Sequence, residues 1–202
     1  MKFELGKKRY NDYPTFFKTL FEERVQKLSI DGGFTCPNRD GSKGVGGCSF
    51  CNNESFNPDY CRAVRGITEQ IDEGIRFFAR KYKGQRYLAY FQAYSNTYAP
   101  LDVLKLRYEE ALAHPMISGL VIGTRPDVVS EEVLDYLEEL ARRYYVCVEY
   151  GVESVNDTVL RQVNRGHDFA VAEQAIRATA GRGITIGAHL IFGLPGESRE
   201  SM

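Results

Sequence analysis

Three cysteines in one glycine-rich segment carry the clearest chemical signal of the sequence. Cys36, Cys48 and Cys51 form a C-x11-C-x2-C pattern. Three thiolates can hold three irons of a [4Fe–4S] cluster and leave the fourth iron open, whereas electron-transfer clusters are usually held by four cysteines. The amino and carboxylate groups of S-adenosylmethionine (SAM) can chelate an open iron. Electron transfer into its sulfonium then makes a radical that no ordinary side chain can make.

Two other interpretations of the cysteines remain open at this point. Cys61 follows Cys51 by ten residues, so four thiolates could form a tetrahedral zinc site. Cys61 could also complete an electron-transfer cluster. Cys147 lies within an apolar run and is most simply a buried small hydrophobe. Metal analysis of protein purified without oxygen distinguishes zinc from iron.

Composition describes an ordinary globular chain. Its 202 residues are 43% hydrophobic and 26% charged, which fits one large domain. The net charge of −1 gives no global signature of nucleic-acid binding. Local basic runs exist at 7–9 and 80–86. The sequence offers neither a membrane-length apolar stretch nor a secretion signal, so we expect a cytoplasmic protein without a membrane partner. Its thiols would then stay reduced. The oligomeric state is left unknown.

Short apolar runs alternate with longer amphipathic ones along the chain. The runs are rich in Val, Ile and aromatic residues and predict five strands, at 25–30, 87–91, 120–122, 145–152 and 184–192. Helical spacing of apolar residues predicts five helices, at 67–78, 101–112, 130–140, 157–163 and 168–180. This alternation predicts a parallel sheet with helices outside it. The cysteines fall in a long loop after the first strand, where parallel sheets carry function.

The cysteine loop also resembles a known group of proteins. The Cys-Ser-Phe-Cys ending at 48–51, placed after the first strand, resembles the radical SAM superfamily. The long gap before Cys48 resembles the branch that contains the catalytic subunit of the elongator complex. The segments 36–51, 9–13 and 27–34 resemble a bacterial family of the YhcC/YtqA type. This likeness covers essentially the whole chain.

The resemblance implies an α/β fold, namely the partial (β/α) barrel of the radical SAM type. Residues 1–24 would then be an N-terminal extension and residues 25–202 the radical SAM core domain. Gly193 to Glu197 resembles a turn into a sixth helix. We therefore expect the core to be truncated after the fifth strand, with its C-terminal end incomplete.

Charged residues after the third and fourth predicted strands are candidates for SAM contacts. Glu153 suits the two ribose hydroxyls, a role that the resemblance also implies. Arg165 suits the SAM carboxylate because Arg binds carboxylates with two hydrogen bonds, and Arg125 is a second candidate. Purely structural explanations exist for Glu153 and Arg165 as residues near helix ends. His189 is more simply a hydrogen-bonded core histidine.

The resemblance implies further contacts to SAM. Phe50 would pack near the adenine, and the strand ending at Ile191 and Gly193 would offer backbone groups to the adenine edge. The second strand lacks the Gly-Gly-Glu-type stretch that contacts the SAM amino group in the superfamily. Gln92, Tyr94 and Ser95 are the candidates to replace it.

The implied function is reductive cleavage of SAM to a 5′-deoxyadenosyl radical. Cys36, Cys48 and Cys51 would be the metal ligands and the catalytic residues. An external reductant of the flavodoxin or ferredoxin type would supply the electron. The resemblance further implies a tRNA substrate and modification of the wobble uridine. Radical chemistry on a small metabolite is the alternative.

Overall fold

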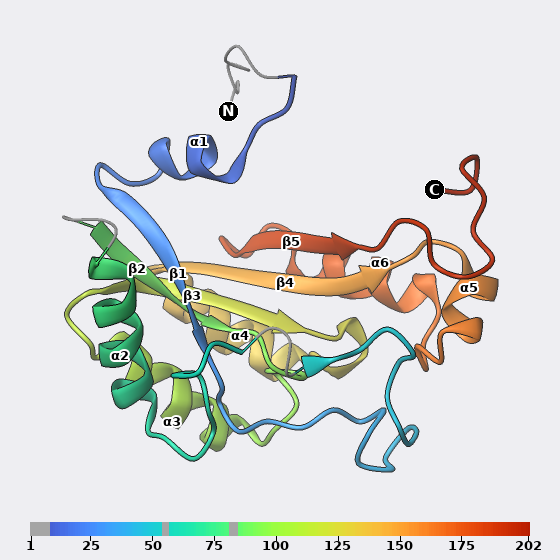
Figure 1. Cartoon of the computed structure of the whole chain (residues 1–202), viewed down its shortest axis with the longest axis horizontal. Helices are drawn as coiled ribbons and strands as arrows, with labels where there is room; N and C mark the ends of the chain where they lie inside the picture. The colour runs from blue at the N-terminus through green and yellow to red at the C-terminus, as the bar shows by residue number, and fades with distance from the viewer. Residues whose placement is uncertain (1–8, 54–56, 81–84) are drawn as a thin grey trace.

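A single parallel sheet organises the chain. The computed structural model describes residues 9–53, 57–80 and 85–202. Five strands lie in the order β1-β2-β3-β4-β5, and each pairs with its neighbours in parallel (Figure 1). Their bounds are β1 Arg24–Ile30, β2 Gln85–Phe91, β3 Ile117–Thr124, β4 Tyr145–Glu153 and β5 Thr185–Leu190. All five strands confirm the prediction.

The predicted helices are also present, and most of them cover one face of the sheet. They are α2 Ile67–Ala79, α3 Leu101–Leu112, α4 Glu131–Ala141, α5 Asp157–Gln162 and α6 Phe169–Thr179, with a short 3-10 helix η2 at Pro126–Val128. Ser130 and Asp168 cap α4 and α6 through their side chains, as N-cap residues do. The main core lies between this face and the helices α2, α3, α4 and α6, with Leu28, Leu120 and Val148 fully buried in it.

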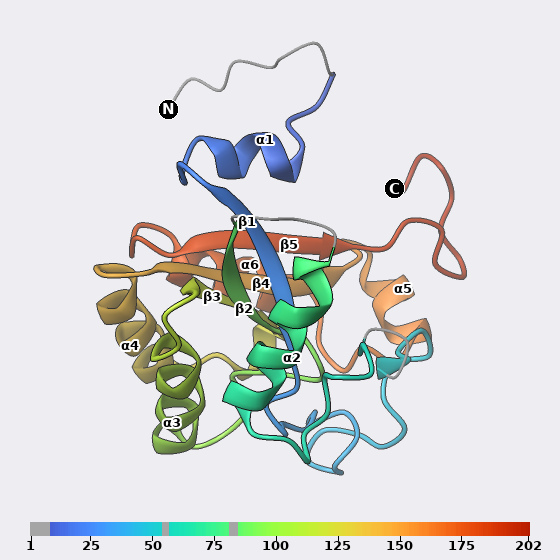
Figure 2. The ribbon, with the colours of Figure 1, turned by 60° about the vertical axis from the view of Figure 1, so that its left-hand side comes forward.

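An additional short helix, α1 (Tyr13–Lys18), packs on the opposite face of the sheet, which we call the inner face. Figure 2 shows α1 on one side of the sheet and α2, α3 and α4 on the other. Phe17 is buried there against Leu88 and Val121. Phe17 and Phe21 each lie 5.7 Å from the ring of Tyr145, at the start of β4. Helix α1 therefore covers the amino-terminal end of the inner face and leaves its carboxyl end for the cysteine loop.

Some of the predictions concern residues outside the described part of the chain. Lys7, Lys8, Lys81 and Lys83 belong to the basic runs but lie outside the described residues. None of the described helices has the length and apolar character needed to cross a membrane.

Candidate functional site

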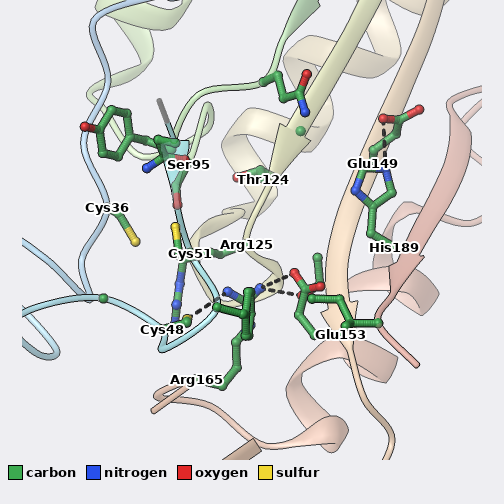
Figure 3. A pocket seen from close by; sticks show the side chains of 18 of the residues that line it. Cys36, Cys48, Cys51, Ser95, Thr124, Arg125, Glu149, Glu153, Arg165 and His189 are labelled. Atoms are coloured by element: carbon green, nitrogen blue, oxygen red, sulfur yellow. Dashed lines mark hydrogen bonds and ion pairs between the residues drawn. The ribbon is translucent and has the colours of Figure 1, made fainter. Parts of the chain in front are cut away.

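A cavity of about 580 Å³ opens at the carboxyl ends of the strands, the edge at which parallel sheets bind ligands. Its volume is in the range of cofactor sites. The three cysteines lie on one side of it in Figure 3, and Glu149 and His189 lie on the other. Ten of the predicted site residues line this cavity: Cys36, Cys48, Phe50, Cys51, Gln92, Ser95, Arg125, Glu153, Arg165 and Ile191.

The cysteine loop is fixed to the turn between α5 and α6 by three hydrogen bonds. The Ser49 amide donates to the Val163 carbonyl at 3.0 Å. The side chain of Asn164 donates to the Gly47 carbonyl at 2.9 Å, and that of Asn38 donates to the Asn164 carbonyl at 2.5 Å. Two segments far apart in sequence thus form one unit. This unit sets the position of the next residue in the turn, Arg165, relative to the cysteines.

The sulfur of Cys48 accepts two hydrogen bonds from this unit. Asn38 Nδ2 lies 3.6 Å from the sulfur, and Arg165 Nη1 lies 3.7 Å from it. Arg39 donates to the Cys51 carbonyl at 2.9 Å. It packs against Gly47, where a Cβ atom would lie 2.7 Å from Arg39 Nε. The loop therefore presents its thiols to the cavity, with two N–H donors directed at the Cys48 sulfur. Hydrogen bonds to sulfur tune iron–sulfur clusters.

The other two cysteines lie outside this cavity. Cys61 is buried and directs its thiol to Asn57 Oδ1 at 3.7 Å. Burial, with the charge of Asp31, raises the pKa of Cys61 to about 12. Burial likewise raises the pKa of Cys147 to about 12, in the apolar cluster on the inner face, as predicted for a buried hydrophobe. Thiols held in the protonated form are poor metal ligands.

Arg165 and Glu153 form a buried pair in the middle of the cavity. Arg165 Nη2 donates to the Gly151 carbonyl and lies 3.7 Å from Glu153 Oε1 (Figure 3). Arg165 Nε is buried without a partner in the described part of the chain. Burial raises the pKa of Glu153, against the opposing charges of Arg165 and His189. The pair thus offers an unused donor and a carboxylate to a ligand.

Backbone strain is concentrated around this cavity. Tyr94, Glu153 and Asn164 have positive φ angles of 64°, 68° and 55°. Non-glycine residues seldom adopt this region, and such strain is found mostly at functional sites. Tyr94 and Glu153 line the cavity, and Asn164 precedes Arg165. The irregular register of β4 at Gly151 and Glu153 belongs to the same strained segment.

Arg125 is also buried in the cavity wall, but a carboxylate already occupies most of its guanidinium. Arg125 Nε and Nη2 each donate to Asp127 at 2.9 Å, and Lys43 from the cysteine loop donates to Asp127 at 2.7 Å. Arg125 Nη1 and Ser95 Oγ are buried without partners among the described residues. Burial opposes ionisation of Asp127, but its hydrogen bonds to Arg125 and Lys43 lower its pKa from 3.8 to about 2.

We expect Asp127→Asn to lower the free energy of unfolding by about 3 kcal/mol at neutral pH, because Arg125 would remain buried without its charge partner. The pKa of Asp127 is lower in the folded chain than its ordinary value. Its ionisation therefore stabilises the fold fully above about pH 4, and this stabilisation is lost as the pH falls toward 2. Urea unfolding at several pH values measures both effects.

Asp135→Asn is the matched control, because that carboxylate is 67% exposed in its ion pair with Arg182. Exposed pairs contribute at most about 1 kcal/mol. Equal losses of unfolding free energy in the two variants would contradict the assignment. So would an unfolding free energy of Asp127→Asn that still falls between about pH 4 and pH 2 as steeply as that of the wild type.

Apolar side chains close one end of the cavity. Phe50 and Ile191 pack against the buried cluster of Val159, Val163 and Leu194. Gly193 is placed differently from the other predicted site residues, because it does not line the cavity. Its amide donates instead to Glu197 Oε2 at 3.1 Å.

His189 is not the buried core histidine that we expected from the sequence. Its side chain is 51% exposed in the cavity wall, and its Nε2 lies 3.1 Å from Glu149 Oε2. Sequence reasoning did not single out Glu149 or Tyr90, which also line the cavity. One sequence signal could have identified Glu149: it is a charged residue within the otherwise apolar interior of strand β4.

Sequence comparison identifies relatives of this chain. Residues 36–202 match the family model described as the radical SAM superfamily. Protein YhcC of Escherichia coli is 44% identical over 180 residues, covering 89% of this chain and 57% of that protein. YtqA of Bacillus subtilis is 37% identical over 195 residues, covering 96% of this chain and 61% of that protein. The chain therefore spans about three fifths of the length of these relatives.

Two further likenesses are more distant. A tRNA uridine(34) acetyltransferase of Methanocaldococcus infernus is 31% identical over 94 residues, which are 46% of this chain and 17% of that protein. Among solved structures, the archaeal Elp3 of the same organism, with an N-terminal deletion, superimposes with a TM-score of 0.60. Its identity is 18%, and the match covers 89% of this chain and 40% of that one. This structural likeness supports the partial barrel fold. The family match over residues 36–202 shows that the chain belongs to the radical SAM superfamily.

Proposed function

We propose that Cys36, Cys48 and Cys51 hold a [4Fe–4S] cluster whose open iron binds SAM. The observation that carries this proposal is one cavity lined by three thiols, by buried donors without partners and by a buried carboxylate. With an electron from an external flavodoxin- or ferredoxin-type reductant, the cluster would supply reductive cleavage of SAM to methionine and a 5′-deoxyadenosyl radical.

Within the described residues, no three His, Cys, Asp or Glu side chains are close enough to hold a single metal ion. A cluster of four irons differs from such a site, because its cysteines bind separate irons. The three cysteine thiols that line one cavity are the donor set that such a cluster would need.

The surrounding residues fit the parts of SAM. Arg165 Nε, Arg125 Nη1 and Ser95 Oγ are the unpartnered donors in the cavity wall. We assign Arg165 to the SAM carboxylate and Glu153 to the ribose hydroxyls. Phe50 and Ile191 would enclose the adenine. Ser95 and Gln92 would contact the amino group, and Arg125 could add one hydrogen bond to the carboxylate.

Reductive cleavage can be tested directly. Protein reconstituted without oxygen and reduced with dithionite should convert SAM to 5′-deoxyadenosine and methionine, measured by liquid chromatography and mass spectrometry. Bound iron without 5′-deoxyadenosine would favour an electron-transfer protein. Stoichiometric zinc without iron would favour a zinc site.

We further propose that the substrate is tRNA, at the wobble uridine. Support comes from the resemblance to the elongator branch and from the relative named as a tRNA uridine(34) acetyltransferase. The net charge of −1 adds nothing to this argument. Nucleoside mass spectrometry of tRNA from a deletion strain tests it, and unchanged wobble uridines would favour a small-molecule substrate.

A further inference from the structure

Three charged side chains from separate strands meet on the inner face, and the proposed SAM contacts do not include them. Glu149 on β4 accepts a hydrogen bond from Lys27 Nζ on β1 and pairs with His189 on β5. Strands β1 and β4 are not neighbours, since β2 and β3 lie between them. The Lys27–Glu149 contact therefore crosses the inner face of the sheet above β2 and β3. Gly187 makes room for Glu149, because a Cβ at that glycine would lie 2.8 Å from Glu149 Cγ.

Aromatic rings hold Lys27 in this position. Its ammonium lies 4.6 Å from the ring centroid of Tyr13 on α1 and 4.3 Å from that of Tyr90 on β2. Cations are attracted to such ring faces. Burial raises the pKa of both tyrosines, which keeps them neutral. Two rings and one carboxylate thus surround Lys27, so its charge acts on the cavity from a fixed position.

His189 is the most exposed member of the group: its side chain is 51% exposed in the cavity wall, which the buried Glu149 also lines. Its Nε2 is bound to Glu149, and in Figure 3 its other ring nitrogen faces the side of the cysteines. The hydrogen bond to Glu149, together with the charges of Glu149 and Glu153, raises the pKa of His189 against the effects of burial and Lys27. Hydrogen bonds from His189 and the charge of Lys27 overcome burial and lower the pKa of Glu149 to about 2. With His189 protonated, one carboxylate lies between two cations, which leaves one positive charge.

We propose that His189, held by Glu149 and Lys27, forms a substrate subsite that binds an anionic oxygen group, either a carboxylate or a phosphate. The subsite lies across the cavity from the cysteines, so a substrate bound there would lie next to SAM. The inference rests on the proposed function to that extent. A phosphate would suit a nucleotide or nucleic acid, and a carboxylate would suit a small metabolite.

NMR of the histidine side chains tests the subsite without knowledge of the substrate. The chain has three histidines, so the spectrum of 15N-histidine-labelled holoprotein is simple. Sodium phosphate and sodium acetate are titrated separately at constant ionic strength, with chloride as the reference anion. We expect at least one probe to shift the His189 signals saturably and to raise the pKa of His189 further. A response to phosphate alone assigns a phosphate, and a response to acetate alone assigns a carboxylate.

The other histidines serve as internal controls. His114, in the turn after α3, pairs with Asp72 on α2, and burial lowers the pKa of His167 to about 4. No saturable shift of His189 with either probe, or an equal shift of His114, overturns the proposal. SAM cleavage is measured on the same preparation. Cleavage without a His189 response defeats the subsite alone, and a His189 response without cleavage defeats the proposed function alone.

Substitutions sharpen the test. Lys27→Gln should weaken probe binding about tenfold, because the subsite loses its fixed cation. Lys105→Gln is the matched control, since Lys105 also lies over a tyrosine ring, 5.2 Å from that of Tyr136, but on α3. Glu149→Gln should return the pKa of His189 toward its ordinary value, an effect that general destabilisation would not produce.

Discussion

Alanine at any one of Cys36, Cys48 and Cys51 should abolish both cluster assembly and SAM cleavage. Each thiolate would bind a separate iron, so the loss of one leaves a second iron open and the cluster unstable. Reconstituted wild-type protein should contain about four irons per chain with broad visible absorption. Iron and sulfide analysis, absorption spectra and 5′-deoxyadenosine formation measure the outcome.

The chain provides matched controls for this experiment. Cys61→Ala and Cys147→Ala should retain iron and cleavage, because both thiols lie outside the cavity and burial raises their pKa values. A loss of iron in Cys61→Ala, with folding intact by circular dichroism, would restore the four-cysteine interpretations. Retention of a full cluster after loss of any loop cysteine would remove the proposed ligand set.

Periodicity alone predicted the layers of this fold. The runs around Leu28, Leu120 and Val148 are short and apolar, and these residues are buried in the main core. Short apolar runs of this kind predict buried strands. Helices α4 and α6 carry side-chain caps at their first turns, which fixed their starts in the prediction. Helix α1 was missed because six residues give less than two turns of periodicity. The burial of its aromatic residues depends on packing against the inner face, which the local sequence does not show.

The candidate site was predictable where a motif is local in sequence. The cysteine loop is such a motif. The pair of Arg125 and Asp127 is equally local in sequence, but Arg125 was predicted only as a second candidate for the SAM carboxylate. Contacts that depend on sheet register could not be predicted in this way. Lys27 and Glu149 are 122 positions apart. Their meeting requires both the strand order and the curvature of the sheet.

Asn38 illustrates the same limit within the motif itself. Nothing in its type predicts a bond to the Cys48 sulfur, and an asparagine next to a proline is usual in turns. Two glycines leave the space that the Asn38 side chain occupies in the structure. A Cβ at Gly44 would lie 2.4 Å from Asn38 Oδ1, and one at Gly166 would lie 3.3 Å from it. The glycines of the loop therefore make room for a side-chain amide as well as for backbone turns.

Glu153→Gln should weaken SAM binding by about 1–3 kcal/mol, or roughly 5- to 150-fold, because the amide is a weaker acceptor for the ribose hydroxyls than a carboxylate. Iron content should stay unchanged, since no cysteine contacts Glu153 in the described structure. Equilibrium dialysis with labelled SAM measures the affinity. Glu173→Gln is the matched control, because that carboxylate is 49% exposed and pairs with Arg177 on α6.

Acid should reproduce the effect of this substitution in the wild-type protein. Burial raises the pKa of Glu153 above 4.5, so the carboxylate becomes protonated at a higher pH than an exposed glutamate would. Wild-type affinity for SAM should therefore fall as the pH drops through this raised pKa, while Glu153→Gln keeps an affinity that is nearly independent of pH in that range. Parallel pH profiles of the two proteins would exclude Glu153 as the ribose ligand.

Arg165→Ala should weaken SAM binding by a similar amount and should also alter the cluster. Arg165 contacts Cys48 and Gly151 as well as Glu153, so its loss removes an N–H donor from a ligand sulfur. Hydrogen bonds to sulfur raise the reduction potential of such clusters. The potential, followed by electron paramagnetic resonance, should fall in Arg165→Ala and stay unchanged in Glu153→Gln. Wild-type SAM affinity in both variants would show that the Arg165–Glu153 pair only holds the cysteine loop in place.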